Sequence, residues 1–330
     1  MALPHHWMVR LLLLSIAHAS RVLSLPGLRV LSSEGSDASL PCLDSGSGRQ
    51  REGFRKLDLR WTRERVAAGR YPLLMLGSDG VVKRGLSEPS QRARVSGERV
   101  EAGDYSLNLR GVRAGDSGTY HCLVRHGNTR LEEAVKLHVV QVRLVSEGFP
   151  VEGGELGLLC EISSHLPGAR TSWHRGGSPV PATGRFRTEE GGRRLNIAEL
   201  EPQDRGDWEC RVAFEAQTVS AWYLLQIFGF LEAKRAVPAV YARPGTHALL
   251  SLALAPGTAG VPLRWGWLRG RGVGSRPAGN VPPLAGASLR PGWLSLSLAP
   301  ALPSDRGLFT GYLNTSGSWI ERTVRLEFVE

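Results

Sequence analysis

The sequence contains little that would support catalysis or metal binding. It holds only 4 cysteines in 330 residues, and no two of them have the C-x-x-C spacing of zinc or redox motifs. It also lacks a G-x-S-x-G nucleophile elbow, a metal-binding histidine pair and a phosphate-binding glycine loop. We therefore expect no enzymatic activity, no cofactor and no metal site.

Long apolar segments are equally scarce. Residues 1–10 carry one positive charge, residues 11–16 are mostly apolar, and residues 17–19 (Ala-His-Ala) have the form of a cleavage site. Residues 1–19 are thus predicted to be a signal peptide. After them no run approaches the roughly 20 apolar residues of a membrane helix, and residues 223–231 come nearest. We expect an extracellular protein, either secreted or held at the cell surface by an anchor outside this sequence.

Export to an oxidising compartment changes how the cysteines are interpreted. An even number of cysteines in a secreted chain indicates disulfides, here two. No stretch has the apolar period of a helix, and 40 glycines and 20 prolines interrupt short apolar, β-branched runs. This pattern predicts an all-β chain with many turns.

A repeated motif defines the fold. Residues 116–122 (DSGTYHC) recur as residues 204–210 (DRGDWEC) and, more weakly, as residues 305–311 (DRGLFTG). In immunoglobulin-like sandwiches this motif is a tight turn into strand F, where an aromatic residue closes the corner and the cysteine bridges to strand B. Trp61 and Trp173 lie where the core tryptophan of strand C is expected.

The cysteine spacing distinguishes two domain types. Cys42 and Cys122 are 80 positions apart, as in a variable-type domain, and Cys160 and Cys210 are 50 apart, as in a compact constant-type domain. Pairing within each domain is the connectivity that fits both spacings. We predict the bridges Cys42–Cys122 and Cys160–Cys210.

Two arginines are candidates for structural ion pairs at the end of these sandwiches. Arg94, before the expected strand D of the first domain, is predicted to pair with Asp116. Arg185 could pair with Asp204 in the second domain.

The third unit keeps this layout without a bridge. Residues 249–254 occupy the strand B position, and Gly311 stands where the second cysteine would be. Its core must then depend on apolar packing, including the alternating run at residues 294–298.

These features predict three tandem immunoglobulin-like β-sandwiches. We place a V-type domain at residues 20–140, a C2-type domain at 141–228, and a V-type domain without a disulfide at 229–330. Residues 136–144 alternate without glycine or proline, so one strand should run from the first sandwich into the second. The second junction, residues 226–237, contains Gly229 and charged residues and is expected to be looser.

With this domain order, the mature chain resembles the family of the helper-T-cell coreceptor and the lymphocyte activation gene 3 protein. Residues 70–71, 77–80 and 103–110 are most similar to the lymphocyte activation branch. The resemblance implies a cell-surface receptor that binds MHC class II protein on an opposing cell and modulates T-cell activation. Two features depart from the family, because this sequence has three rather than four extracellular domains and lacks the proline-rich insertion of that branch.

The charge distribution points to the first domain as the binding domain. Of a net charge of +10, that domain has 20 Lys and Arg against 14 Asp and Glu, which favours an acidic partner surface. Within it, Val81, Val82, Lys83 and Arg84 combine an apolar pair with two cations at an expected sheet edge. The alternative is an ordinary edge strand whose cations prevent aggregation.

Other candidate features are weaker. Arg92 and Arg99 are further ligand-binding candidates, and the basic segment 49–56 could bind heparan sulfate. Asn314 begins the one N-x-S/T sequon and is predicted to carry a glycan. No motif supports nucleic-acid binding. A competing function is a secreted or adhesive module with homophilic or glycosaminoglycan binding, in which the chain could be a homodimer.

Overall fold

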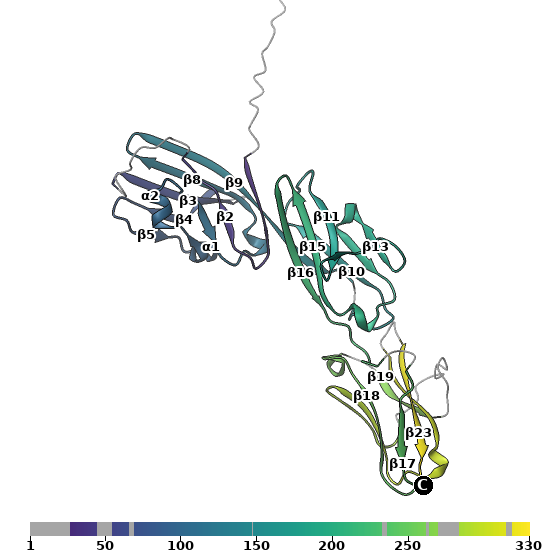
Figure 1. The fold of residues 1–330 in the computed structure, drawn as a ribbon. Helices are drawn as coiled ribbons and strands as arrows, with labels where there is room; N and C mark the ends of the chain where they lie inside the picture. Colours follow the sequence, from purple (N-terminus) through teal and green to yellow (C-terminus); the bar gives the residue numbers. More distant parts are fainter. Residues whose placement is uncertain are drawn as a thin grey trace, which may run out of the picture.

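The computed structural model describes residues 27–44, 55–65, 69–146, 148–232, 236–261, 264–269, 284–314 and 319–330. The predicted signal peptide and most of the basic segment 49–56 lie outside these residues. Figure 1 shows three β-sandwiches that follow one another along the chain. Within the described ranges, neither of the two short α-helices has the length and apolar character needed to cross a membrane.

The first sandwich encloses a leucine-rich core between two sheets. One sheet has the order β9, β8, β3, β4, β5, with β1 parallel to β9, and the other has the order β2, β7, β6. The Cys42–Cys122 bridge and the buried Trp61 ring lie in this core, where Trp61 Nε1 donates to Tyr105 O at 2.9 Å. Its elements are β1 (Leu28–Ser33), β2 (Ala38–Leu40), β3 (Leu57–Arg65), β4 (Gly69–Leu76), β5 (Val82–Arg84), α1 (Glu88–Arg92), β6 (Ala93–Arg94), α2 (Gly97–Glu101), β7 (Leu107–Leu109), η1 (Ala114–Asp116), β8 (Gly118–His126) and β9 (Thr129–Leu144).

The second sandwich shares β9 with the first. β9 pairs with β10, and β14 and β13 follow, while the facing sheet has the order β12, β11, β15, β16. Trp173 and the Cys160–Cys210 bridge are buried between the sheets. Its elements are β10 (Leu156–Ile162), β11 (Arg170–Arg175), β12 (Ser178–Pro179), β13 (Phe186–Glu189), η2 (Glu190–Gly192), β14 (Arg194–Ile197), η3 (Pro202–Asp204), β15 (Gly206–Phe214) and β16 (Gln217–Leu225).

The repeated motif closes the same corner in both bridged sandwiches. Tyr120 Oη donates to Asp116 O at 2.6 Å, and Trp208 Nε1 donates to Asp204 O at 2.9 Å. The predicted pair of Arg185 and Asp204 is confirmed, with Nη2 to Oδ1 at 2.7 Å. Each aromatic residue thus joins the core to the turn that precedes its cysteine.

The third sandwich fills the position of the bridge with leucine. A Cβ atom on Gly311 would lie 2.5 Å from Leu252 Cδ1 and 3.0 Å from Leu294 Cδ2, beside the buried Trp267. Leucine packing therefore occupies the space that a disulfide takes in the other two cores. The sheets have the orders β17, β23, β22, β19 and β18, β21, β20. Its elements are β17 (Ala239–Ala242), β18 (Ala248–Ala253), η4 (Thr258–Gly260), β19 (Arg264–Arg269), β20 (Ala287–Arg290), β21 (Trp293–Leu298), η5 (Pro303–Asp305), β22 (Gly307–Asn314) and β23 (Trp319–Phe328).

The first junction contains the predicted continuous strand. Residues 129–137 of β9 pair with β8, and residues 140–144 pair with β10. The Gln217 side chain on β16 accepts from Leu31 N at 2.9 Å and donates to Arg29 O at 2.7 Å, which ties β1 to the second sandwich. A shared strand and a second hydrogen-bonded contact make this junction stiff.

A buried histidine lies within that strand. His138 Nδ1 is 2.7 Å from Ser164 Oγ of the second sandwich. Burial, together with the cations of Lys136 and Arg29, lowers the pKa of His138 to about 4. The imidazole is therefore neutral at neutral pH and acts as a structural hydrogen-bonding group.

The second junction is packed more closely than predicted. Arg322 Nη2 of β23 is 2.6 Å from Glu152 Oε1 of the second sandwich, and their side chains are only 1% and 9% exposed. Val151 packs in the core of the third sandwich. Gly229 brings its backbone close to Glu152, since a Cβ there would lie 3.3 Å from Glu152 Cβ. Gly229, which was expected to make the second junction looser, instead allows a close contact between the second and third domains.

Candidate functional site

The predicted ligand-binding strand β5 lies at the margin of the first sandwich (Figure 1). It is the last strand in its sheet and pairs with β4, with Leu76 opposite Val82 and Leu74 opposite Arg84. Three residues are too few to build a core, so β5 contributes mainly an edge and the side chains displayed along it. We call residues 81–86 the β5 edge.

The two valines of this edge differ in their surroundings. Val81 is 53% exposed, whereas Val82 is half-buried and packs against the core of the first sandwich. The turn before them is fixed by Asp79 Oδ1, which accepts from Val81 N at 3.0 Å. This hydrogen bond, with a smaller contribution from Lys83, lowers the pKa of Asp79. Val82 is thus partly a core residue, and Val81 is the freer apolar group.

The two cations point to solvent. Lys83 Nζ is 3.6 Å from Asp79 Oδ2, a surface pair of little energetic weight. Arg84 is exposed, and its Nε donates a long hydrogen bond of 3.3 Å to Ala93 O. Both charges therefore remain available to a partner.

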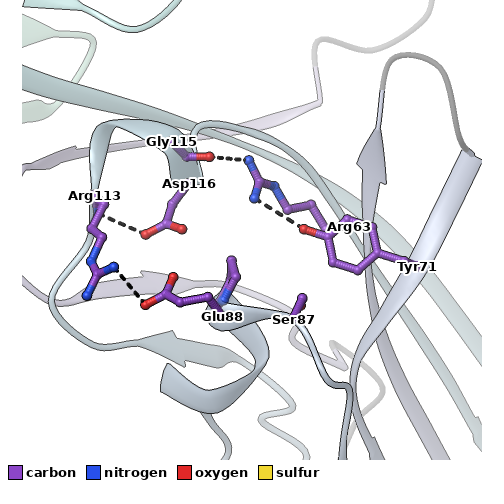
Figure 2. Close-up of a pocket in the computed structure, with 8 residues that line it drawn as sticks. Arg63, Tyr71, Ser87, Glu88, Arg113, Gly115 and Asp116 are labelled. Carbon is purple, nitrogen blue, oxygen red and sulfur yellow. Dashed lines mark hydrogen bonds and ion pairs between the residues drawn. The ribbon is translucent and has the colours of Figure 1, made fainter.

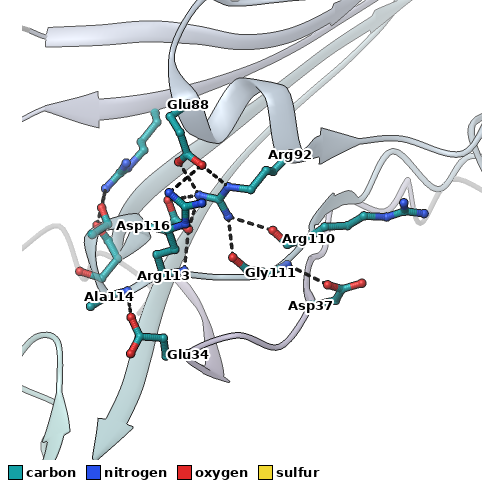
Figure 3. Close-up of polar contacts among 12 residues, drawn as sticks. Glu34, Asp37, Glu88, Arg92, Arg110, Gly111, Arg113, Ala114 and Asp116 are labelled. Carbon is teal, nitrogen blue, oxygen red and sulfur yellow. Dashed lines mark hydrogen bonds and ion pairs between the residues drawn. The ribbon is translucent and has the colours of Figure 1, made fainter. Parts of the chain in front are cut away.

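The predicted ion pair between Arg94 and Asp116 is wrong. Arg92, which was predicted to bind a ligand, pairs with Asp116 instead. Arg92, not Arg94, holds Asp116: its Nη2 donates to the two carboxylate oxygens at 2.8 and 2.7 Å, as Figure 3 shows. Arg92 also binds Glu88 through Nε and Nη2, both at 2.8 Å. The hydrogen bonds that Arg92 donates to Glu88, and then to Asp116, raise the pKa of Arg92.

The register between β6 and β7 explains why Arg92, rather than Arg94, pairs with Asp116. Ala93 faces Leu109 and Arg94 faces Asn108, so residue 92 lies nearest the turn that carries Asp116. Arg94 instead donates to the carbonyl oxygens of Gln91 and Ala93. Arg92 is consequently a structural residue and is not available as a ligand contact.

Arg99 does not belong to the β5 edge either. It lies on α2, and its Nε forms an ion pair with Asp104 Oδ2 at 2.9 Å. The structure thus brings Val81, Lys83 and Arg84 together and separates Arg92 and Arg99 from them.

A shallow hollow of about 540 Å³ lies near α1, but its polar groups bind one another (Figure 2). Arg63 donates to Ser117 O at 2.8 Å and to Tyr71 Oη at 3.2 Å, and Arg113 is 3.1 Å from Glu88. These hydrogen bonds and this ion pair are made within the protein. In the part of the chain that the structure describes, no group of three metal-binding side chains occurs.

Sequence reasoning missed two exposed apolar features. Leu86, at the end of the β5 edge, is 100% exposed. On the second sandwich, the outer strand β16 displays Trp222 and Leu224, each more than half exposed. β16 has nine residues (QTVSAWYLL) with no charge and no proline, which is unusual for an edge strand. Its composition was visible in the sequence, but its edge position was not.

Comparisons with known proteins agree with this architecture. A family model described as "Immunoglobulin V-set domain" matches residues 27–140, and one described as "Immunoglobulin I-set domain" matches residues 146–227. The chain is 27% identical to the mouse (Mus musculus) lymphocyte activation gene 3 protein over 272 residues, which is 80% of this chain and 49% of that protein. It is 30% identical to human (Homo sapiens) butyrophilin subfamily 1 member A1 over 171 residues, which is 49% of this chain and 31% of that protein.

The comparisons also refine the expected domain types. The second domain, expected to be C2-type, matches the I-set model, and it has both a β12 strand beside β11 and a β13 strand beside β14. The rat (Rattus norvegicus) lymphocyte activation gene 3 protein is 24% identical over 269 residues, 48% of its length. The chain therefore spans about half the length of these relatives and about a third of butyrophilin.

Proposed function

We propose that this chain is an immune-receptor ectodomain whose β5 edge binds MHC class II protein. The chain carries tandem immunoglobulin domains of the V-set and I-set types. One observation carries the proposal: the similarity to lymphocyte activation gene 3 protein extends over 80% of the chain. The receptor would be presented at the cell surface and would modulate T-cell activation. Asn314, at the end of β22, would carry a glycan on the third domain.

The chemistry of the β5 edge supports this assignment. Lys83 and Arg84 are exposed cations on a basic domain, and the apolar Val81 lies beside them. Apolar groups bordered by charges suit a protein partner, because the apolar part is buried on binding while the charges steer association. An acidic partner surface is the complementary one.

Charge reversal at the edge should slow association with MHC class II protein. We expect the full chain with Lys83→Glu and Arg84→Glu to have a roughly tenfold lower association rate at low salt, and a weaker salt dependence, because steering by these cations is lost. The measurement is surface plasmon resonance at low and physiological salt. The control variant carries Arg290→Glu and Arg325→Glu. It changes the net charge of the chain by the same amount, but at two exposed residues of the third domain. Equal rates for both variants would assign the effect to net charge alone.

A homophilic function is the second candidate, and β16 favours it. Within the described residues this strand pairs with β15 on one side; along its other side no strand ladder forms, although β1 and β9 lie close to it. Edge strands that lack charge, proline and bulges tend to pair with another strand. Two copies related by a two-fold axis could therefore pair through β16 and bury Trp222 and Leu224.

Disrupting β16 should shift the chain from dimer to monomer. We expect Trp222→Glu to remove dimers that the parent chain forms at micromolar concentration, because the carboxylate would be buried without a partner. Analytical ultracentrifugation gives the mass directly. The matched control is Leu249→Glu, a half-exposed leucine on the third domain, which should leave the mass unchanged. A parent chain that sediments as a monomer at all concentrations would remove the homophilic candidate.

A further inference from the structure

Strand β9 passes from the first sandwich to the second at two residues. Its residues 129–137 pair with β8 and its residues 140–144 pair with β10, so His138 and Val139 lie between the two ladders. Val139 belongs to the core of the first sandwich, and Val140 belongs to the core of the second. His138 therefore lies at the point where the chain changes from one core to the other.

A turn of the second sandwich binds β9 at this point. Ser163, which follows β10, donates its amide to Val139 O at 2.9 Å, and its hydroxyl accepts from Val139 N at 2.9 Å. Ser164 Oγ lies 2.7 Å from His138 Nδ1. Strand β1 pairs with the same stretch of β9 and places Leu31 opposite His138. The imidazole thus lies where elements of both sandwiches meet.

The second ring nitrogen of His138 is buried without a hydrogen-bond partner among the described residues. His138 is only 2% exposed, and its Nε2 is the unpaired atom. A neutral imidazole needs a single N–H, and Ser164 can serve Nδ1 as donor or acceptor. Protonation places a charge and an N–H on both nitrogens, so one buried donor lacks an acceptor. The geometry therefore favours the neutral ring.

The charges that act on His138 oppose its protonation further. Lys136 on β9 and Arg29 on β1 are both cations. Strand β16 contributes no charged side chain, and neither does the start of β8, which pairs with Leu137. The adjacent His165 is exposed to solvent. An imidazolium at this position would meet like charge, because the groups acting on it are positive.

The carboxylates on the elements packed against β9 bind other groups. Glu34, which follows β1, accepts from the backbone of η1 at 3.3 Å. Asp116 in η1 is bound by Arg92, and Glu161 on β10 is bound by Arg143 at 2.7 Å. These acids are therefore committed to partners other than His138.

We propose that His138 is a pH switch at the first junction: the neutral imidazole holds the two sandwiches together through Ser164, and the protonated imidazole opens this contact, so that the first sandwich can move relative to the second. Buried histidines act in this way in proteins that respond to mildly acidic compartments. The switch lies away from the β5 edge and requires no partner, so it goes beyond the proposed function and does not depend on it.

The switch should act as the pH falls below the ordinary histidine value. Burial, and then the two cations, lower the pKa of His138 from 6.5 to about 4. The closed junction is therefore fully favoured above pH 6.5 and loses stability as the pH falls towards 4. Between pH 7 and pH 5, proton uptake by the opened junction should raise its population roughly twentyfold.

Hydrogen exchange of the full chain measures this opening. The amides of Val139 and Ser163 form the hydrogen bonds of the junction. Their protection, corrected for the intrinsic exchange rate at each pH, should fall roughly twentyfold from pH 7 to pH 5. His138→Gln keeps a hydrogen-bonding side chain that does not titrate, so its protection should change less than about threefold. His165→Gln, at the exposed neighbouring histidine, should behave like the parent.

Three results would overturn the switch. The first is an NMR titration of the parent imidazoles that places the pKa of His138 at the ordinary 6.5, a measurement that needs no variant. The second is an equal loss of protection in His138→Gln and the parent, which would assign the pH dependence to other groups. The third is an equal loss at Tyr120 and Cys122 in the first core, which would mean that acid unfolds the domain instead of opening the junction.

Discussion

Arg92→Ala should lower the free energy of unfolding of the first domain by about 3 kcal/mol, whereas Arg94→Ala should change it by less than about 0.5 kcal/mol. Arg92 holds the buried carboxylate of Asp116, and removing the cation leaves that charge without its partner. Arg94 binds only nearby carbonyl oxygens at the surface. The two arginines are two positions apart, Arg92 at the end of α1 and Arg94 in β6, so each is a matched control for the other.

The measurement is calorimetric unfolding of the full chain, in which the first-domain transition is the one that Asp116→Ala and Arg92→Ala both shift to lower temperature. Asp116→Ala, alone and with Arg92→Ala, completes a double-mutant cycle that isolates the pair. A coupling near zero, or an Arg94→Ala variant as unstable as Arg92→Ala, would contradict the register seen in the structure.

The same two arginines show where sequence reasoning reaches its limit. The repeated corner and the cysteine spacing predicted the sandwiches, because an aromatic closure and a disulfide require particular residue types at fixed separations. Arg92 and Arg94 are two positions apart, and the local sequence alone does not distinguish which of them pairs with the carboxylate. Only the pairing of Ala93 with Leu109 decides which of them reaches Asp116.

Leu86 illustrates a second limit. Its exposure depends on the close approach of Gly85 to Pro72 O on a neighbouring strand, a contact that the local sequence does not reveal. The β5 edge itself was predicted from its composition, since cations beside apolar residues are typical of a protected or a binding edge. What the pattern could not show is which apolar residue is free of the core.

Contacts between domains are the least predictable from sequence. Glu152 and Arg322 are 170 positions apart, and neither lies in a motif. The expectation of a looser second junction relied on Gly229 and nearby charges, which are also what a close, polar contact requires. Burial distinguishes the two interpretations, and burial depends on how the sandwiches meet.

Arg322→Ala should lower the free energy of unfolding of the third domain by about 3–5 kcal/mol, since it leaves Glu152 buried without its cation. Arg322 also donates to Glu232 O at 2.8 Å, and its guanidinium lies 5.6 Å from the Phe230 ring centre, so its loss affects both sides of the junction. Calorimetry of the full chain measures the transition. Arg325→Ala, an exposed arginine on the same strand, should cost less than about 0.5 kcal/mol.

A double replacement tests whether the charge or the packing matters at this junction. Glu152→Leu with Arg322→Met removes both charges and keeps apolar volume, so it should recover most of the stability that Arg322→Ala loses. If the double variant is as unstable as Arg322→Ala, the hydrogen bonds of Arg322 to backbone oxygens hold the junction, rather than its pairing with Glu152. If Arg322→Ala itself unfolds like the parent, the third sandwich is stable without this contact, and its leucine core carries the fold alone.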